Sequence, residues 1–517
     1  MKTTQLLLAF LILPLFMFSQ VQQNKKYKVT TGIPYPEVKA NETIFSNNDG
    51  IIEIVKLHKK NIVLQEINTE TSEEISNHLI PVLNKGENFR KILKLKGKIY
   101  IFITAKDKPN DDHYTLYSKE INFSNKSVGE RKKLVAFKSN YYNDYLLIRK
   151  SADESKVFIL NNEKPIDKNK LTNQVVLFLV VLNSELKTKW TKEVQMRYKE
   201  QRMQNIKYDI DNKGIVYILT EVYDDDTKKK YLNNEFNYHI ELITVFKDEV
   251  NYSKLDNRNF HITSLNLYEP KNKDMYLFGY YADNVLAKGN ANEMFIAKLN
   301  DLLEIEVISS FEIPLNIISQ YESESTQEKN IKKEQKGILG IPNLKIIEII
   351  PLEDSCYLII GEQRTVSYNG NMLMFSYKDV ILTKIDANGK LQWMSKVPKN
   401  NGGPTEEGPN SYKYINYKGD HYIVFLGIVD KSNTNIPIKQ DSGEKGIKLI
   451  IYSINDDGGD IDISSVLNLK QVEIQGQMMP IAIYKYSQKK IVETQNGFSI
   501  EMNKKKKQDV MVNISID

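Results

Sequence analysis

Cysteine, tryptophan and histidine are scarce in this chain, which has one, two and six of them in 517 residues. A single thiol, Cys356, allows no disulfide within the chain, so its stability has to come from a hydrophobic core. Cys356 stands among apolar residues of a predicted strand, where a small buried hydrophobe is expected rather than a catalytic thiol. The histidines are scattered singly, without zinc-ligand spacing. These shortages argue against a disulfide scaffold, a zinc enzyme and a cysteine hydrolase.

Long apolar runs are also missing, apart from one at the N-terminus. Lys2 and the apolar run 6–18 precede a small residue, Ser19, which is the pattern of a cleaved signal peptide at 1–19. The run is shorter than the roughly 20 residues of a membrane span. The next run, 175–182, suits a buried strand. We predict an exported chain, periplasmic or extracellular, with no membrane span after signal cleavage.

Charge of one sign is not in excess. The chain has 71 basic and 66 acidic side chains, for a formal net charge of +5. Because the two signs are interspersed, the sequence indicates no nucleic-acid partner. Thirty Tyr and 19 Phe, with only 15 Pro and 24 Gly, fit a strand-rich protein with a large core.

One unit, residues 344–399, is the clearest copy of a pattern that recurs along the chain. Its predicted strands are 346–350, 356–361, 379–385 and a fourth that carries Leu391 and Trp393. A polar loop is predicted between the second and third strands, and Asp386-Ala387-Asn388-Gly389 forms the turn before the fourth. An apolar residue after this turn would anchor the fourth strand against the next unit. The unit is therefore a four-stranded antiparallel meander.

Eight such units account for nearly all of the mature chain. The predicted second strands are 51–57, 98–105, 156–160, 214–221, 274–279, 356–361, 421–428 and 497–502. The predicted third strands begin at Asn61, Tyr114, Val175, His239, Met294, Asp379, Ile447 and Asp509. Four-stranded meanders in tandem are typical of a β-propeller.

The last unit lacks a fourth strand, and the segment 25–31 is strand-like. If this segment supplies the missing strand, the ring closes and no sheet edge stays open. We therefore predict an all-β fold, one propeller domain over 25–517, with eight blades or, as the alternative, seven. We expect a monomer. A charged segment at 314–343 is predicted to be a mobile loop, with or without a helical turn, and 400–411 a Gly/Pro-rich connection.

Acidic turns are the candidate metal sites. Three stretches, 209–214, 224–226 and 456–462, concentrate Asp and Asn, whose oxygens suit calcium. None has EF-hand spacing, and hairpin turns use the same residues. The best of the three carries Asp456, Asp457, Asp460 and Asp462, which we keep as weak calcium candidates. No other cofactor is predicted.

The turn Asp386-Ala387-Asn388-Gly389-Lys390-Leu391-Gln392-Trp393 resembles the docking repeat of quinoprotein-type propellers and, less closely, the Asp box of sialidase-type propellers. Those elements recur in most blades, whereas one unit carries the pattern here, so the resemblance supports a blade and not a quinone cofactor. Residues 344–399 also resemble the central repeat of uncharacterised exported propeller-like proteins of bacteria. That resemblance implies fold and export, and it brings no catalytic residue.

Function follows less directly than fold. There is no Gly-x-Ser-x-Gly elbow, so a prolyl-peptidase-like hydrolase would lack its nucleophile. Among so many acidic residues nothing selects a catalytic pair. We predict no catalytic or cofactor-binding residue and expect a non-catalytic binding or scaffold module for a protein, peptide or glycan. A propeller-type polysaccharide hydrolase or lyase is the alternative.

Overall fold

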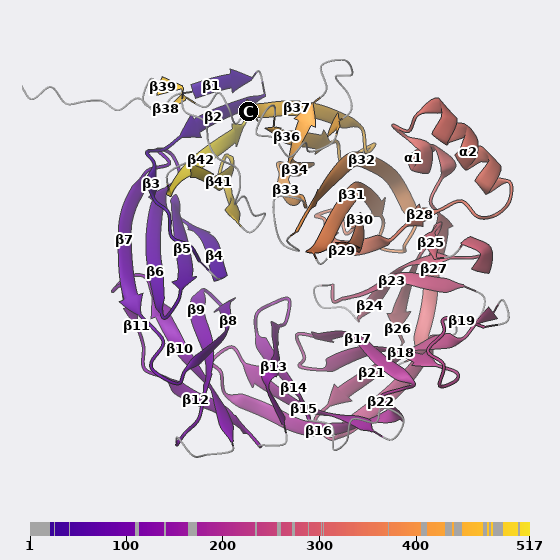
Figure 1. Ribbon diagram of the computed structural model, residues 1–517, viewed down its shortest axis with the longest axis horizontal. Coiled ribbons are helices and arrows are strands. Elements are labelled where there is room, and N and C mark those ends of the chain that lie inside the picture. Colours follow the sequence, from indigo (N-terminus) through magenta and orange to yellow (C-terminus); the bar gives the residue numbers. More distant parts are fainter. Residues whose placement is uncertain are drawn as a thin grey trace, which may run out of the picture.

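Eight antiparallel sheets stand around a central axis in the computed structural model, which confirms the eight-bladed propeller (Figure 1). The structure describes residues 21–517 except 25, 41, 109–112, 139–140, 164–172, 233–234, 256–259, 271–274, 288, 301, 303, 371, 405–410, 430–436, 439–446, 469–472, 475–476, 479–489 and 505–506. The signal predicted at 1–19 lies outside the described residues and stays a prediction. Among the helices in the described part, none is long and apolar enough to cross a membrane.

Seven blades are meanders of consecutive segments, numbered here in chain order and given from the inner to the outer strand. Blades 1 to 4 are β4 Glu42–Asn48, β5 Ile51–His58, β6 Asn61–Asn68, β7 Glu74–Pro81; β8 Asn88–Leu95, β9 Lys98–Ala105, β10 Tyr114–Asn122, β12 Lys132–Phe137; β13 Tyr141–Lys150, β14 Lys156–Glu163, β15 Gln174–Asn183, β16 Thr188–Lys199; and β17 Met203–Ile210, β18 Val216–Tyr223, β21 Tyr238–Phe246, β22 Glu249–Leu255.

Blades 5 to 7 follow the same order. They are β23 His261–Tyr268, β24 Tyr276–Ala282, β26 Glu293–Leu299, β27 Ile305–Glu312; β29 Leu344–Pro351, β30 Tyr357–Asn369, β31 Met372–Ile385, β32 Leu391–Gly403; and β33 Lys413–Tyr417, β34 Asp420–Val429, β36 Ile447–Ile454, β37 Ile461–Asn468. Two-residue strands lie in the connections: β11 Ser127–Val128, β19 Tyr231–Leu232, β20 Glu235–Phe236, β25 Asn290–Ala291, β28 Ile341–Pro342, β35 Pro437–Ile438, β38 Glu473–Ile474 and β39 Gln477–Met478.

Blade 8 joins the two ends of the chain, as predicted. Its strands are β40 Ile491–Thr494, β41 Gly497–Lys504, β42 Gln508–Ile516 and, on the outside, β2 Tyr27–Thr31, with β1 Val21–Asn24 beyond it. In β2, Tyr27 pairs with Ile516 and Thr31 with Val512. The short β3 Tyr35–Pro36 pairs with the start of β42. This closure leaves no gap between the last and the first blade.

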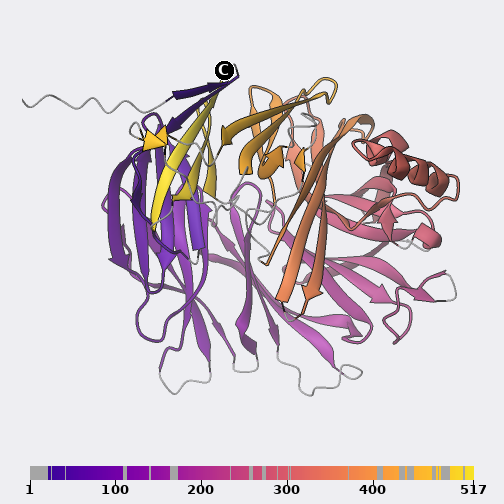
Figure 2. The ribbon, with the colours of Figure 1, turned by 45° about the horizontal axis from the view of Figure 1, so that its top comes forward.

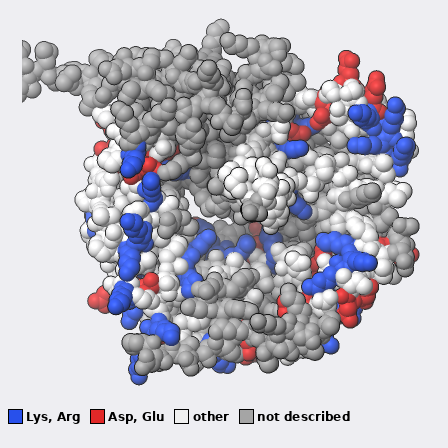
Figure 3. All heavy atoms as spheres, in the orientation of Figure 1, with Lys and Arg blue, Asp and Glu red and all other residues white. Residues whose placement is uncertain are grey.

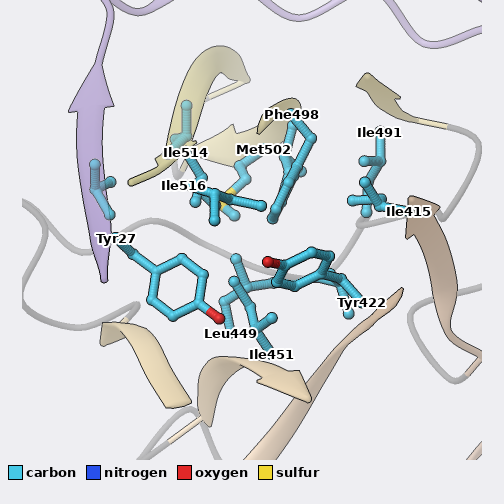
Figure 4. Packing of buried hydrophobic residues seen from close by; sticks show 14 of the residues in the cluster. Tyr27, Ile415, Tyr422, Leu449, Ile451, Ile491, Phe498, Met502, Ile514 and Ile516 are labelled. Carbon is cyan, nitrogen blue, oxygen red and sulfur yellow. The ribbon is translucent and has the colours of Figure 1, made fainter. Parts of the chain in front are cut away.

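The core lies between neighbouring blades. Between blades 7 and 8, Tyr27 packs with Tyr422, Leu449, Phe498 and Ile514, so the N-terminal strand is held by side chains as well as by its ladder (Figure 4). Alternating apolar residues on both faces of each blade produce such a cluster at successive interfaces. The blades are therefore fixed to one another mainly by the burial of aliphatic and Tyr side chains.

The two tryptophans anchor fourth strands, as expected from the turn that precedes each of them. Trp190 of blade 3 is buried against blade 4, and its indole nitrogen donates to the carbonyl of Gly214 at 3.2 Å. Trp393 of blade 6 is buried against blade 7 and donates to the carbonyl of Asp456 at 2.7 Å. Gly459 has a φ of +71°, and a Cβ there would lie 2.7 Å from the Trp393 ring. The glycine of this acidic turn is thus required by packing.

The segment between blades 5 and 6 is helical where a mobile loop was predicted. It forms α1 Leu315–Ser319 and α2 Glu324–Glu334. Glu, Gln and Lys favour helix, and Glu324 near the start and Lys333 near the end of α2 complement the helix dipole. Lys396 of β32 donates to the Ile318 carbonyl at 3.1 Å, which fastens the helices to blade 6. Local helix propensity and this anchor explain the difference.

Candidate functional site: the long-loop face and the channel wall

Long connections leave one face of the ring, and short turns occupy the other. In an antiparallel meander the connections from second to third strand and from fourth strand to the next blade must lie on the same side. That side carries the β30–β31 hairpin, the α1–α2 segment and the connection from β18 to β21. We call it the long-loop face. The acidic turn 456–462 lies on the opposite side, since it joins a third strand to a fourth.

The β30–β31 hairpin is the largest departure from the predicted blade. A polar loop was expected here. Instead, β30 is 13 residues long and β31 is 14, and the two strands stay paired as far as Asn369 and Met372 (Figure 2). Gly370, at φ +59°, takes the first position of the two-residue loop, where that backbone conformation favours glycine. The prediction was wrong because this ladder extends beyond the repeat shared with other blades.

One side of this hairpin is apolar. Cross-strand partners point to the same side of a hairpin, and so do alternate residues of one strand. Val366 pairs with Phe375 and Tyr368 with Leu373, so these four side chains lie on one side. Val366 is 60% exposed and Tyr368 78%. No charged residue occurs from 365 to 377, in a chain that is 26% charged. An uncharged knob stands at the position of β29–β31 in the space-filling view (Figure 3). We call Val366, Tyr368, Leu373 and Phe375 the hairpin's apolar side.

A buried ion pair fixes the base of the hairpin. Lys399 and Glu362 are fully buried, with Nζ and Oε1 3.0 Å apart. Arg364 donates from Nε to Glu362 Oε2 at 2.7 Å and stacks on Tyr377, its cross-strand partner. Ser411 also donates to Glu362 Oε2, at 3.0 Å. Burial lowers the pKa of Lys399, although Glu362 opposes that shift. The hairpin is therefore held on blade 6 by charge-assisted hydrogen bonds.

The second feature is the charge of the innermost strands. Where side chains are described, these strands carry Arg90, Lys91, Lys94, Arg149, Lys150, Lys207, Lys345 and Lys413, against Asp209, Glu348 and Glu493. The space-filling view shows a hollow at the centre of the ring with Lys and Arg atoms around it (Figure 3). The charges of the whole sequence nearly balance, yet the described part of the strands next to the axis has an excess of basic residues. We call these innermost strands the channel wall.

Hydrogen bonds connect the inner strands of blades 4, 5 and 6. Lys207 Nζ donates to Asn266 Oδ1 at 2.6 Å, and Asn266 Nδ2 donates to the carbonyl of Ile346 at 3.1 Å. Lys345 Nζ donates to the carbonyl of Thr263 at 2.5 Å. Burial lowers the pKa of Lys207 to about 8, with Arg149 adding to the shift and Asp209 opposing it. Burial likewise raises the pKa of Asp209. These lysines are held by neutral oxygens.

The four calcium candidates lie at one turn of blade 7. The Asp456 carboxylate receives Lys384 Nζ at 2.9 Å and His421 Nε2 at 2.8 Å. Asp457, Asp460 and Asp462 are exposed. In the part of the chain that the structure covers, no group of three or more His, Cys, Asp or Glu residues is placed to hold a metal ion. Asp456 thus has a structural role, and calcium binding by this turn stays a prediction.

The lone thiol and the buried histidines belong to the blades. Burial raises the pKa of Cys356 to about 11, and Asp354 adds to the shift, so the group is a protonated thiol at neutral pH. His421 is buried, and its two ring nitrogens form hydrogen bonds with Tyr414 and Asp456. Burial lowers the pKa of His421. His261 is buried against Tyr238, and burial lowers its pKa to about 4. His261 and His421 thus pack between neighbouring blades, and Cys356 is a buried structural residue.

Comparison with known proteins finds only distant structural similarities, which carry no argument about this chain. No family model matches the chain, and no curated protein matches it. Among solved structures, the WD40 domain of SCAP from fission yeast has a TM-score of 0.39 at 9% identity, over 96% of this chain and 98% of that one. A post-proline cleaving enzyme from Rickettsia typhi has a TM-score of 0.37 at 10% identity, over 92% of this chain and 58% of that one.

Prolyl oligopeptidase B from Galerina marginata is a third such structure, with a TM-score of 0.38 at 8% identity over 92% of this chain and 55% of that one. The chain therefore spans just over half the length of the post-proline enzymes. At these TM-scores the similarities carry no functional argument.

Proposed function

We propose that this chain is a non-catalytic binding propeller that holds a protein partner on the apolar side of the β30–β31 hairpin. One observation carries the proposal: a rigidly based hairpin exposes Val366 and Tyr368 with no charged residue from 365 to 377. Exposed apolar patches of this kind mark interaction surfaces, and Tyr is enriched among residues that dominate binding energy. The signal predicted at 1–19 would put the interaction in the periplasm or outside the cell.

The geometry of the hairpin suits recognition of a protein surface. Arg364 and the network around Glu362 fix the base, so little conformational entropy is lost when the tip binds. The two-residue loop at Gly370 keeps the tip narrow. A narrow, uncharged ribbon fits a partner groove in which Tyr368 and Val366 act as anchors and lose their contact with water.

The catalytic alternative, a propeller-type polysaccharide hydrolase or lyase, requires carboxylates that face one another. The inner-strand carboxylates with a pKa raised by burial are Asp209 on β17 and Glu348 on β29, two blades apart. No observation selects them as a pair. The hairpin, by contrast, is a feature that blade packing alone does not require.

Site-directed photocrosslinking tests the proposal. A photoreactive amino acid at position 368 should give a discrete adduct with a second protein in cells that natively make the chain, and Val366→Asp should abolish the adduct. With the partner purified, the double variant Val366→Ser, Tyr368→Ser should weaken binding at least tenfold, since anchor residues of this type cost about 2 kcal/mol or more when truncated.

The control is the same change on an outer strand. Leu79 of β7 is 64% exposed, so Leu79→Ser should leave affinity within twofold, and a photoreactive group at 79 should not give the adduct. The absence of any adduct at 368, or the same adducts from both positions, would overturn the proposal. An adduct of twice the chain mass would instead identify a second copy of the chain as the occupant.

A further inference from the structure

The described lysines differ in whether a carboxylate of the chain compensates their positive charge. Among the residues that the structure describes, five lysines are buried, and each is ion-paired with a carboxylate: Lys56, Lys119, Lys384, Lys396 and Lys399. Lys207 on the inner strand β17 is only partly exposed, yet its ammonium group donates to an amide oxygen of Asn266. Removing a cation from water without a counter-charge is costly, so proteins pair such groups with an anion.

Arg149 of β13 adds a second positive charge next to Lys207. It is exposed on the inner strand of blade 3, and its charge acts on both Lys207 and Asp209 of blade 4. Within the described part of the chain, no carboxylate lies within ion-pair distance of Arg149 or Lys207. Asp209 is the acidic group beside them, so one carboxylate faces two cations, and burial raises the pKa of that carboxylate.

We propose that Arg149 and Lys207 form a binding site for an oxyanion, a carboxylate or a phosphate of the ligand, on the channel wall between β13 and β23. Arg149 would supply a planar pair of donors to two ligand oxygens, and Lys207 a point charge fixed by Asn266. Lys345 on β29, which donates to the Thr263 carbonyl of the same strand as Asn266, would meet a longer anion nearer the long-loop face. The site does not involve the hairpin, so it stands or falls apart from the proposed protein docking.

The donors of Arg149 and Lys207 would bind a carboxylate or a phosphate equally well, and two probes distinguish these ligands. The purified mature chain should bind either trigalacturonate, whose sugars carry carboxylates, or inorganic phosphate, measured by isothermal titration calorimetry at low ionic strength. Arg149→Gln and Lys207→Gln should each weaken binding of that probe at least tenfold, because a charge-assisted hydrogen bond is lost. Whichever probe binds identifies the source of the anion.

The matched control is Lys189→Gln on the outer strand β16, which removes the same charge from an exposed position. It should change affinity less than twofold, and added salt should weaken the native chain and this control alike. Thermal unfolding verifies that each variant is folded. Failure of both probes to bind, or an equal loss in Lys189→Gln, would overturn the inference.

Discussion

The buried lysines and two lysines of the channel wall have opposite surroundings. The buried lysines of the described chain, Lys56, Lys119, Lys384, Lys396 and Lys399, are each ion-paired with a carboxylate of this chain. On the wall, Lys207 and Lys345 donate to neutral oxygens of neighbouring inner strands. The same residue type therefore has two roles. Lys56 and Lys384 tie neighbouring blades together, and Lys399 holds the hairpin on its own blade. Lys207 and Lys345, by contrast, hold positive charge that no carboxylate of the described chain cancels by direct contact.

The closure of the ring is the strongest case of a paired site. Glu501 of β41 receives Lys56 from blade 1, Lys490 at 2.7 Å and the hydroxyl of Tyr35 at 2.9 Å, all in the interior. Burial alone would raise the pKa of Glu501, but Lys56 and Lys490 outweigh it and lower the pKa to about 2. One carboxylate therefore connects the last blade, the first blade and the N-terminal segment.

The largest effect is expected from Glu501→Gln, which removes the carboxylate that Lys56 and Lys490 share. The buried Lys56 then keeps only Asp509 as an ion-pair partner among the described residues. Removing one partner of a buried ion pair costs about 3–5 kcal/mol. Because the folded-state pKa lies below the usual value near 4.3, the stabilisation is present above pH 4–5 and is lost as pH falls towards 2. Denaturant unfolding between pH 7 and pH 3 measures both the loss of stability and its pH dependence. The control is Glu185→Gln, which removes an exposed ion pair with Lys187 and should leave the stability unchanged.

A smaller loss of stability, at the lower end of the range for a broken buried ion pair, is expected from Lys399→Met. Glu362 would keep Arg364 and Ser411 as partners, so its charge stays partly compensated at a cost of roughly 3 kcal/mol. Amide hydrogen exchange should rise along 364–377, because the base of the hairpin loses its anchor. Lys378→Met, at an exposed neighbour without an ion pair among the described residues, serves as control. Unchanged exchange would show that the pair does not hold the hairpin.

The fold was accessible from the sequence because local patterns repeat. Turn residues, alternating strands and the spare strand at 25–31 each reflect interactions between segments close in sequence or at the chain ends, so blade number and closure followed from counting. The hairpin carried a signal that was missed. Gly370-Asn371 between Val366/Tyr368 and Leu373/Phe375 is the pattern of a two-residue hairpin, and the uncharged stretch was taken for a loop.

The channel wall could not be predicted in the same way. Arg149, Lys207 and Lys345 are about 60 to 200 positions apart, and each lies on a different strand. Only the ring brings such strands together, and only the structure shows that Lys207 has an amide partner where Lys399 has a carboxylate. Net charge in sequence was balanced, so nothing marked these residues. The missing information is long-range placement, which residue spacing does not contain.

The smallest effect, and the one that decides the comparison, is expected from Lys207→Met. Burial lowers the pKa of Lys207 to about 8, so between pH 8 and about 10.4 the unfolded chain binds more protons there than the folded chain, and native stability rises with pH through that window. The methionine variant should lack this rise and at pH 7 should be as stable as the native chain or more so, because an uncompensated charge has been removed. Paired denaturant curves at pH 7, 8.5 and 10 measure the difference. A loss at pH 7 as large as that of Lys399→Met would mean that the fold already neutralises Lys207, and the charge on the channel wall would then be compensated in the same way as that of the buried lysines.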